Sequence, residues 1–244
     1  MGRPSGTTVV VTLCAAAVVG VIAVLPLAVP ARHTTAHRTS SRVPIISAPT
    51  NSAPPAAVAP RVLAIGDSVM KGYEVPTGQS WLDLLAAKQS WSLMDRSCNG
   101  AGFIHVAPAD CRTNLPGVIA AASPASPQYV IVSGSVNDFG TNNLQLQAVT
   151  NQAFATLRSE FPTAHIIALR VAWGDRTPPG KVAIIDAQVR TAVAAVHGDF
   201  IDFGTPLLGH PELVQSDHLH PNAAGQLVLE GAIQSALAQA GVVI

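Results

Sequence analysis

A hydroxyl group closes an apolar run in the segment VLAIGDSVMKGY, which begins at Val62. The run is continuous and apolar, as in a buried strand, and Gly66, Asp67 and Ser68 follow it directly. Ser68 is therefore either a turn residue or a nucleophile held at the edge of a sheet. A nucleophilic serine needs a base that takes its proton and an acid that orients the base.

The segment SDHLHPNAAG, which begins at residue 216, contains both an acid and a base. Asp217 lies three positions before His220, and Pro221 follows at the expected first turn of the last helix. A tight turn would place the Asp217 carboxylate on one ring nitrogen of His220 and leave the other nitrogen facing Ser68. Asp217, His218 and His220 also suit zinc, but the sequence contains no second cluster of ligands, which disfavours a metal site.

An attacked carbonyl develops an oxyanion, and each well-placed hydrogen-bond donor stabilises it by about 3–4 kcal/mol. The candidate donors are the backbone N–H of Ser68, the backbone N–H of Gly100 and the side-chain amide of Asn137. Glycine at position 100 would let the backbone approach a substrate closely. Asp138, next to Asn137, is interpreted as a loop or capping residue and not as a second catalytic acid.

Four residues in separate blocks, Ser68, Gly100, Asn137 and His220, give the chain a family resemblance. In this order they resemble the SGNH hydrolases, also called GDSL-type esterases. The resemblance covers residues 61–244 and implies a flavodoxin-like sheet. It also implies hydrolysis of carboxylic esters, often with acyl groups on lipids or carbohydrates.

The resemblance assigns a role to each of these residues. It implies that Ser68 is the nucleophile, that His220 is the base and then the acid, and that Asp217 orients His220. Ser68, Gly100 and Asn137 would form the oxyanion hole. The chain departs from the family pattern at Val69, where leucine is usual, and at Ser135, where glycine is usual. The second departure bears on how the nearby Asn137 side chain points.

Short apolar runs alternate with longer stretches of helical period. The expected strands cover 61–66, 129–134 and 165–173, with weaker candidates at 91–97 and 199–204. The expected helices cover 80–89, 144–161, 181–197 and 222–239. Trp81 lies on an apolar helix stripe and is expected in the core. The alternation predicts an α/β fold, a three-layer α/β/α sandwich with a mostly parallel sheet of about five strands. Ligands bind such sheets beyond the carboxyl ends of the strands.

The N-terminal part of the chain differs in composition from the rest. Residues 1–31 contain an almost purely apolar stretch from Val9 to Val29, about long enough to cross a bilayer. Small residues at Val29 and Ala31 favour a cleaved signal peptide over a permanent membrane anchor. Residues 32–60 are rich in Thr, Ser, Ala and Pro, which predicts a flexible linker before the domain at 61–244. The protein is expected to be secreted or extracytoplasmic.

Cys98 and Cys111 lie 13 positions apart in the predicted domain. In an exported protein this pair predicts a disulfide, which is favoured over two buried free thiols. We expect the loop from Phe103 to Pro116, braced by this bond, to form one wall of the site.

Composition narrows the functional classes. The 14 Lys and Arg residues balance 14 Asp and Glu residues, and charged residues make up only 11% of the chain, so nucleic-acid binding is not expected. The sequence predicts a monomeric serine hydrolase of small-molecule, carbohydrate or lipid esters with short acyl groups, without a metal or organic cofactor. An acyltransferase with the same triad and a catalytically silent glycan-binding module are the alternatives.

Overall fold

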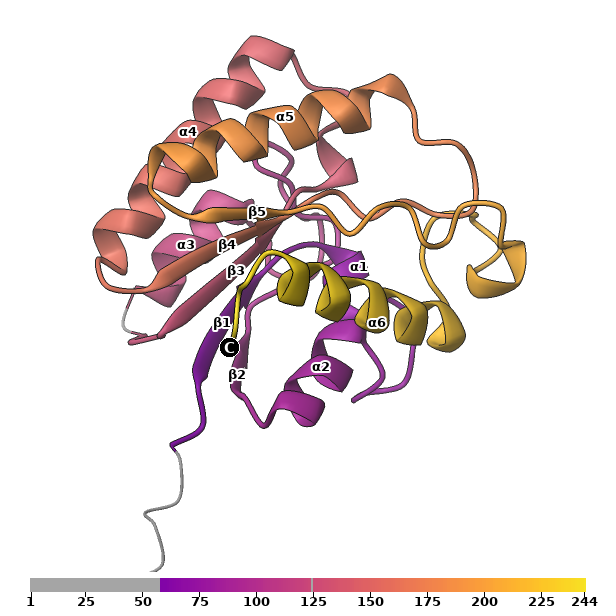
Figure 1. Cartoon of the computed structure of the whole chain (residues 1–244). Coiled ribbons are helices and arrows are strands. Elements are labelled where there is room, and N and C mark those ends of the chain that lie inside the picture. Colours follow the sequence, from indigo (N-terminus) through magenta and orange to yellow (C-terminus); the bar gives the residue numbers. More distant parts are fainter. Residues whose placement is uncertain (1–57, 124) are drawn as a thin grey trace, which may run out of the picture. The chain divides into compact units, whose positions relative to one another are not determined.

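Five parallel strands form one sheet in the order β2-β1-β3-β4-β5 (Figure 1). The computed structural model describes residues 58–123 and 125–244, so the predicted signal segment (1–31) and nearly all of the predicted linker (32–60) lie outside the described residues. The strands are β1 (Arg61–Ile65), β2 (Ser92–Asp95), β3 (Tyr129–Ser133), β4 (His165–Leu169) and β5 (Asp199–Ile201). This order is the flavodoxin-like one that the resemblance implies.

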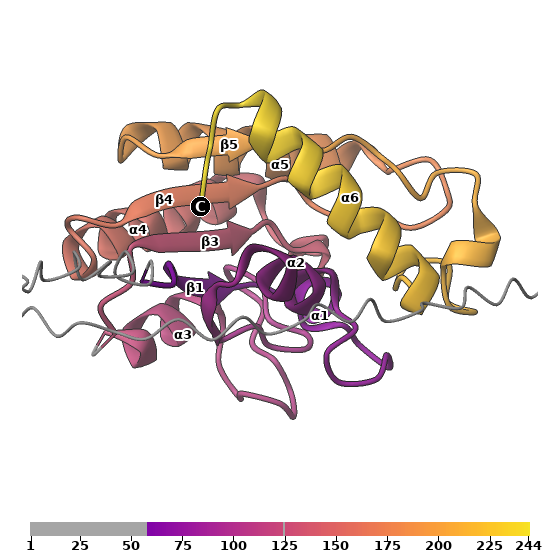
Figure 2. The same ribbon diagram turned by 60° about the horizontal axis from the view of Figure 1, so that its bottom comes forward.

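Helices cover both faces of the sheet (Figures 1 and 2). One face packs against α3 (Leu115–Ala122), α4 (Asn143–Glu160) and α5 (Gly180–Ala195). The other face packs against α1 (Ser68–Lys71), α2 (Trp81–Gln89) and α6 (Ala223–Gln239). Two short 3₁₀ helices, η1 (Val136–Asp138) and η2 (Pro211–Leu213), lie in loops. The predicted three-layer α/β/α sandwich is confirmed.

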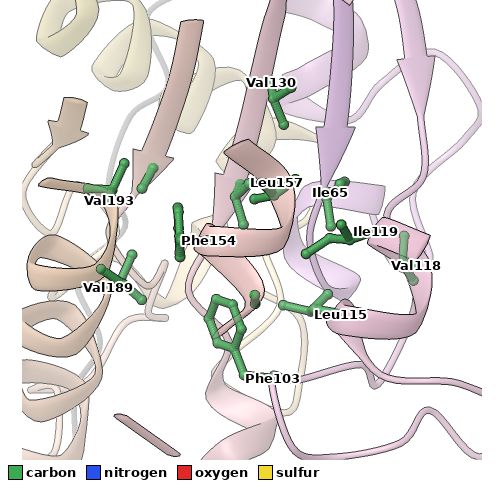
Figure 3. Close-up of a cluster of buried hydrophobic side chains, with 14 of the residues drawn as sticks. Ile65, Phe103, Leu115, Val118, Ile119, Val130, Phe154, Leu157, Val189 and Val193 are labelled. Atoms are coloured by element: carbon green, nitrogen blue, oxygen red, sulfur yellow. The ribbon is translucent and has the colours of Figure 1, made fainter. Parts of the chain in front are cut away.

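The core follows from the alternation of side chains along each strand. In β1, Leu63 and Ile65 belong to the cluster under α3, α4 and α5, whereas Val62 and Ala64 belong to the cluster under α1, α2 and α6. All four are fully buried, which explains why the strand is continuously apolar in sequence. Figure 3 shows the first cluster, with side chains from β1, α3, α4 and α5 gathered together. Trp81 is 2% exposed and belongs to the core, as predicted.

Strand β1 is the point at which the strand order reverses. It pairs with β2 on one side and with β3 on the other, so the sheet is extended from β1 in both directions. The loops that follow β1, β2 and β3 therefore diverge at the carboxyl ends of these strands and leave room for a ligand. Among the described residues, we find no helix with the length and apolarity that crossing a membrane requires.

The predicted disulfide between Cys98 and Cys111 is formed, in the connection between β2 and α3. Asp110, beside it, accepts a hydrogen bond from the backbone N–H of Asn99 at 2.9 Å and pairs with Lys71 of α1. The bond and the Asp110 carboxylate thus connect the start of this long loop to its middle and to the helix that carries Ser68.

Removing the disulfide should lower stability. Closing a loop across 13 positions restricts the unfolded chain, so the Cys98→Ala/Cys111→Ala variant should lose about 3 kcal/mol of unfolding free energy. For a domain of this size, that corresponds to a melting temperature about 6–12 °C lower, measurable by calorimetry. A reductant should shift the wild-type protein similarly and leave the double variant unchanged. An unchanged melting temperature in the double variant would contradict the bracing role.

Candidate active site

Ser68 stands at a sharp turn from strand to helix. It is the first residue of α1, three positions after the end of β1, and is 6% exposed. The carboxylate of Asp67 caps this helix by accepting the N–H of Val69 at 3.0 Å. A Cβ on Gly66 would lie 2.6 Å from the Oγ of Ser133, so the turn requires glycine there. The hydroxyl of Ser68 is thereby fixed at the carboxyl edge of the sheet.

Three residues from the two ends of the domain form a continuous hydrogen-bonded chain. The Oγ of Ser68 lies 2.8 Å from Nε2 of His220, and Nδ1 of His220 lies 2.6 Å from Oδ2 of Asp217. The His220 side chain is 17% exposed, so it lies partly out of water while its edge stays accessible. This is the geometry in which an imidazole can remove a proton from a hydroxyl while a carboxylate orients its ring.

Asp217 and His220 belong to one tight turn. Oδ1 of Asp217 accepts the backbone N–H groups of Leu219 and His220, at 2.9 and 3.0 Å, while Oδ2 faces the imidazole. Partial burial raises the pKa of Asp217, but hydrogen bonds from the His220 ring and from these N–H groups outweigh it and lower the pKa overall. The carboxylate is therefore held in its charged form beside the imidazole.

This turn is closed by its own backbone and is attached, through the Gln215 side chain, to the segment that follows α1. Val214 and Pro221 form an isolated antiparallel bridge at its base, and the N–H of Gln215 donates to the carbonyl of His220 at 2.8 Å. The side-chain amide of Gln215 donates to the carbonyl of Tyr73 at 2.7 Å, and the Tyr73 ring packs 4.7 Å from the His220 ring. The loop after β5 is thereby fastened next to Ser68.

A second histidine–aspartate pair adjoins the turn. Nδ1 of His218 lies 3.0 Å from Oδ2 of Asp175, whose side chain is 8% exposed. His218 has a φ of 63°, in the left-handed region that residues other than glycine rarely adopt. Asp175 lies between β4 and α5, and sequence reasoning missed it because no motif marks it. Across residues 58–123 and 125–244, no three His, Cys, Asp or Glu residues are grouped so as to hold a metal ion.

The candidate oxyanion donors come from three separate loops and line the same pocket. Gly100 has a φ of 83°, a conformation that favours glycine. Within the described residues, the backbone N–H groups of Ser68 and Gly100 have no acceptor and are free to bind a ligand. Nδ2 of Asn137 donates to the carbonyl of Ala101 and to the Oγ of Ser135, both at 3.0 Å. The structure therefore brings every sequence-predicted site residue to one edge of the sheet.

Asp138 organises the loop that carries Gly100. It is fully buried, and its carboxylate accepts the backbone N–H groups of Phe103, Ile104 and His105 at 2.6, 3.0 and 3.0 Å. The interpretation of Asp138 as a loop residue is confirmed, although the number of these bonds could not be inferred from sequence. Nδ1 of His105 lies 2.8 Å from the carbonyl oxygen of Gly100, which further fixes the peptide of that glycine.

The pocket at this edge is small and open to solvent, with a volume of about 150 Å³. It is lined by Ser68, Tyr73, Asn99, Gly100, Val136, Asn137, Leu219 and His220. The prediction that the loop from Phe103 to Pro116 forms a wall of the site is wrong, because Asn99 and Gly100 provide that wall. The loop instead holds that wall in place, because the Asp110 carboxylate accepts the backbone N–H of Asn99.

Asp67 is a buried carboxyl group directly before the candidate nucleophile. Burial raises its pKa above the ordinary value of 3.8, and the N–H of Val69 only partly offsets this effect. The folded protein therefore holds the Asp67 proton more tightly than the unfolded chain does.

Comparison with known proteins matches this chain to one family model and to a curated relative. A family model described as the GDSL-like Lipase/Acylhydrolase family matches residues 64–228. The GDSL lipase Rv0518 of Mycobacterium tuberculosis is 27% identical over 183 residues, which cover 67% of this chain and 75% of the relative.

Solved structures share the fold at low identity. A family two carbohydrate esterase from Cellvibrio japonicus superposes with a TM-score of 0.60 at 17% identity, covering 75% of this chain and 62% of that one. The salicylyl-acyltransferase SsfX3 from a tetracycline biosynthetic pathway gives a TM-score of 0.61 at 19% identity, covering 77% and 56%. The architecture derived above is thus shared with both enzymes.

The raised pKa of Asp67 should appear in the pH dependence of stability. Protonated Asp67 contributes to stability in full below pH 3.8, and this contribution is lost as the pH rises through the folded-state pKa. The free energy of unfolding of the wild type minus that of Asp67→Asn should therefore be larger at pH 4 than at pH 8, which means that the wild type is relatively more stable at pH 4. Denaturant titrations at the two pH values measure this difference. The same difference at both pH values would contradict a raised pKa of Asp67 in the folded protein.

Proposed function

The chain belongs to the GDSL-like lipase/acylhydrolase family, and from this premise we propose that it is a secreted or surface-tethered serine hydrolase that cleaves carboxylic esters. The observation that carries the proposal is the hydrogen-bonded chain from Ser68 through His220 to Asp217, with contacts of 2.8 and 2.6 Å. Secretion rests on the composition of residues 1–31 alone and stays a prediction.

In the proposed acylation step, the Oγ of Ser68 attacks the ester carbonyl while Nε2 of His220 takes its proton. Asp217 holds the opposite ring nitrogen, which fixes the tautomer that can accept a proton and stabilises the imidazolium that forms. The tetrahedral intermediate then collapses. His220 returns the proton to the leaving alcohol, and the acyl group remains on Ser68.

The negative charge of the tetrahedral intermediate falls on the former carbonyl oxygen. The N–H groups of Ser68 and Gly100, together with the amide of Asn137, are the proposed donors. Because the first two have no acceptor among the described residues, they need no rearrangement to bind the oxyanion. Water activated by His220 then attacks the acyl-enzyme and releases the acid. This chemistry requires no metal and no organic cofactor.

The pocket supports a preference for short acyl groups. Its volume of about 150 Å³ is small, and Val136 and Leu219 provide only a short apolar surface beside the nucleophile. An acetyl or similarly short group fits such a pocket, whereas a long chain would leave most of its apolar surface in water. We propose acetyl esters, including acetylated carbohydrates, as the first substrates to test.

Activity should depend on the triad. Release of p-nitrophenol from p-nitrophenyl acetate should fall by at least about 10⁴-fold in Ser68→Ala and His220→Ala, since both act in one proton transfer. Asp217→Asn should lose about 10³-fold or more, because Asp217 orients His220 without itself accepting the proton of Ser68. All variants should keep their far-UV circular dichroism.

His165→Ala is the matched control for His220→Ala. Nε2 of His165 lies 2.6 Å from Asp199, a similar histidine–aspartate pair at the start of β4, on the opposite edge of the sheet from Ser68. Its activity should equal that of the wild type. A folded wild type no more active than its Ser68→Ala variant would contradict the hydrolase. Transfer of the acyl group to an added alcohol in preference to water would instead identify an acyltransferase.

Chain length should separate a short-acyl esterase from a lipase. In a series of p-nitrophenyl acetate, butyrate, octanoate and palmitate, kcat/KM should be highest for the first two and fall steadily thereafter. The physical reason is that the small pocket buries little of a longer chain. A kcat/KM that rises toward palmitate would refute the short-acyl assignment while leaving the triad intact.

A further inference from the structure

Ser135 stands where the family pattern usually has glycine, and its hydroxyl is the centre of a small buried network. The residue is fully buried and precedes η1. Its Oγ donates to the carbonyl of Ala101 at 2.8 Å and accepts the backbone N–H of Asn137 at 3.1 Å and its Nδ2 at 3.0 Å. A hydroxyl has one hydrogen and two lone pairs, so these contacts use all three, and the buried Asp67 carboxyl, whose pKa Ser135 helps to lower, competes for the same hydrogen.

The network connects two of the proposed oxyanion donors. Ala101 follows Gly100, and its carbonyl lies two peptide units after the one that carries the Gly100 N–H, so the bond from Ser135 holds this loop close to that donor. The same hydroxyl holds both the backbone and the side chain of Asn137. The donors that come from the loops after β2 and β3 therefore share a single anchor.

The geometry of this anchor allows a single N–H of Asn137 to serve both of its acceptors. Its Nδ2 lies 3.0 Å from both acceptors, which are 2.8 Å apart, so they subtend an angle of about 56° at the nitrogen. The two N–H bonds of a carboxamide diverge by about 120°. One N–H can therefore serve both acceptors as a three-centre bond, and the second remains for an oxyanion.

We infer that Ser135 is a positioning residue that holds the Asn137 carboxamide, so that its second N–H faces the oxyanion. This inference rests on the proposed function. A glycine at position 135 would leave the side chain of Asn137 with one hydrogen bond, to Ala101, of the two it makes among the described residues. The carboxamide could then rotate, and the donor would have to be ordered anew in each transition state.

A double-mutant cycle tests the inference. Ser135→Ala and Ser135→Gly should each lower kcat on p-nitrophenyl acetate about tenfold with little change in KM, since only the transition state carries the oxyanion. Asn137→Ala should lower kcat about 100-fold. In the Asn137→Ala background, the Ser135 substitutions should have no further effect, because the group that they position is gone. Independent, multiplying effects in the double variant would overturn the inference.

Ser133→Ala is the matched control. Ser133 lies two positions earlier and is also buried, but its Oγ has no hydrogen-bond partner among the described residues. Its removal should leave kcat unchanged, which separates loss of a buried hydroxyl from loss of this anchor. A tenfold fall in kcat for Ser133→Ala would mean that loss of any buried serine hydroxyl in this region lowers kcat. That result would also overturn the specific role of Ser135.

A second readout does not depend on catalysis. The ¹⁵N order parameter of the Asn137 side-chain amide should be that of a rigid group in the wild type and fall below about 0.6 in Ser135→Gly. An unchanged order parameter would contradict the anchoring role. If the wild type showed no esterase activity, the proposed function would fail, yet this measurement would still decide whether Ser135 holds Asn137.

Discussion

The contact between the Oγ of Ser68 and Nε2 of His220 joins residues that are 152 positions apart. Most elements of the fold are needed to bring these two side chains together. Neither residue could reach the other without the sheet. Strand β1 must lie between β2 and β3 so that its carboxyl end meets the loops after those strands, and α6 must pack beside α2 so that the last loop returns over α1. The strand order is therefore a condition of the chemistry as well as of the core.

Around that contact, two buried side chains each hold several polar groups of the loops. Asp138 accepts three backbone N–H groups from one loop, and Ser135 joins two loops through one hydroxyl. Unpaired polar groups at such depth would each cost about 1–3 kcal/mol, so these side chains hold irregular backbone where no sheet or helix can pair it. The N–H groups of Ser68 and Gly100 contrast with them, because they have no acceptor among the described residues.

Much of this could be predicted from the sequence because strong physical signals mark it. Strands such as β3 are buried on both faces and hence continuously apolar, and α4 has a helical period over 18 residues. The four-residue α1 is too short for any period to be detected. The roles of Asp175 and Asp138 were hidden, because their partners are a distant loop and a set of backbone groups. The wall of the pocket was misplaced for the same reason, since spacing does not reveal which side of a loop faces inward.

The turn that carries Asp217 and His220 depends both on local sequence and on the packing of the whole loop. The contact between Asp217 and His220 is made within four consecutive residues, whereas the contact between His220 and Ser68 depends on the packing of the entire last loop. If the loop shifts slightly as a unit, the contact between Asp217 and His220 is kept, whereas the contact between His220 and Ser68 is lost. A slight loosening of the loop would thus leave a polarised imidazole with nothing to deprotonate. If the proposed function holds, the rate of ester hydrolysis is consequently a more sensitive measure of the position of this loop than any spectrum of the fold.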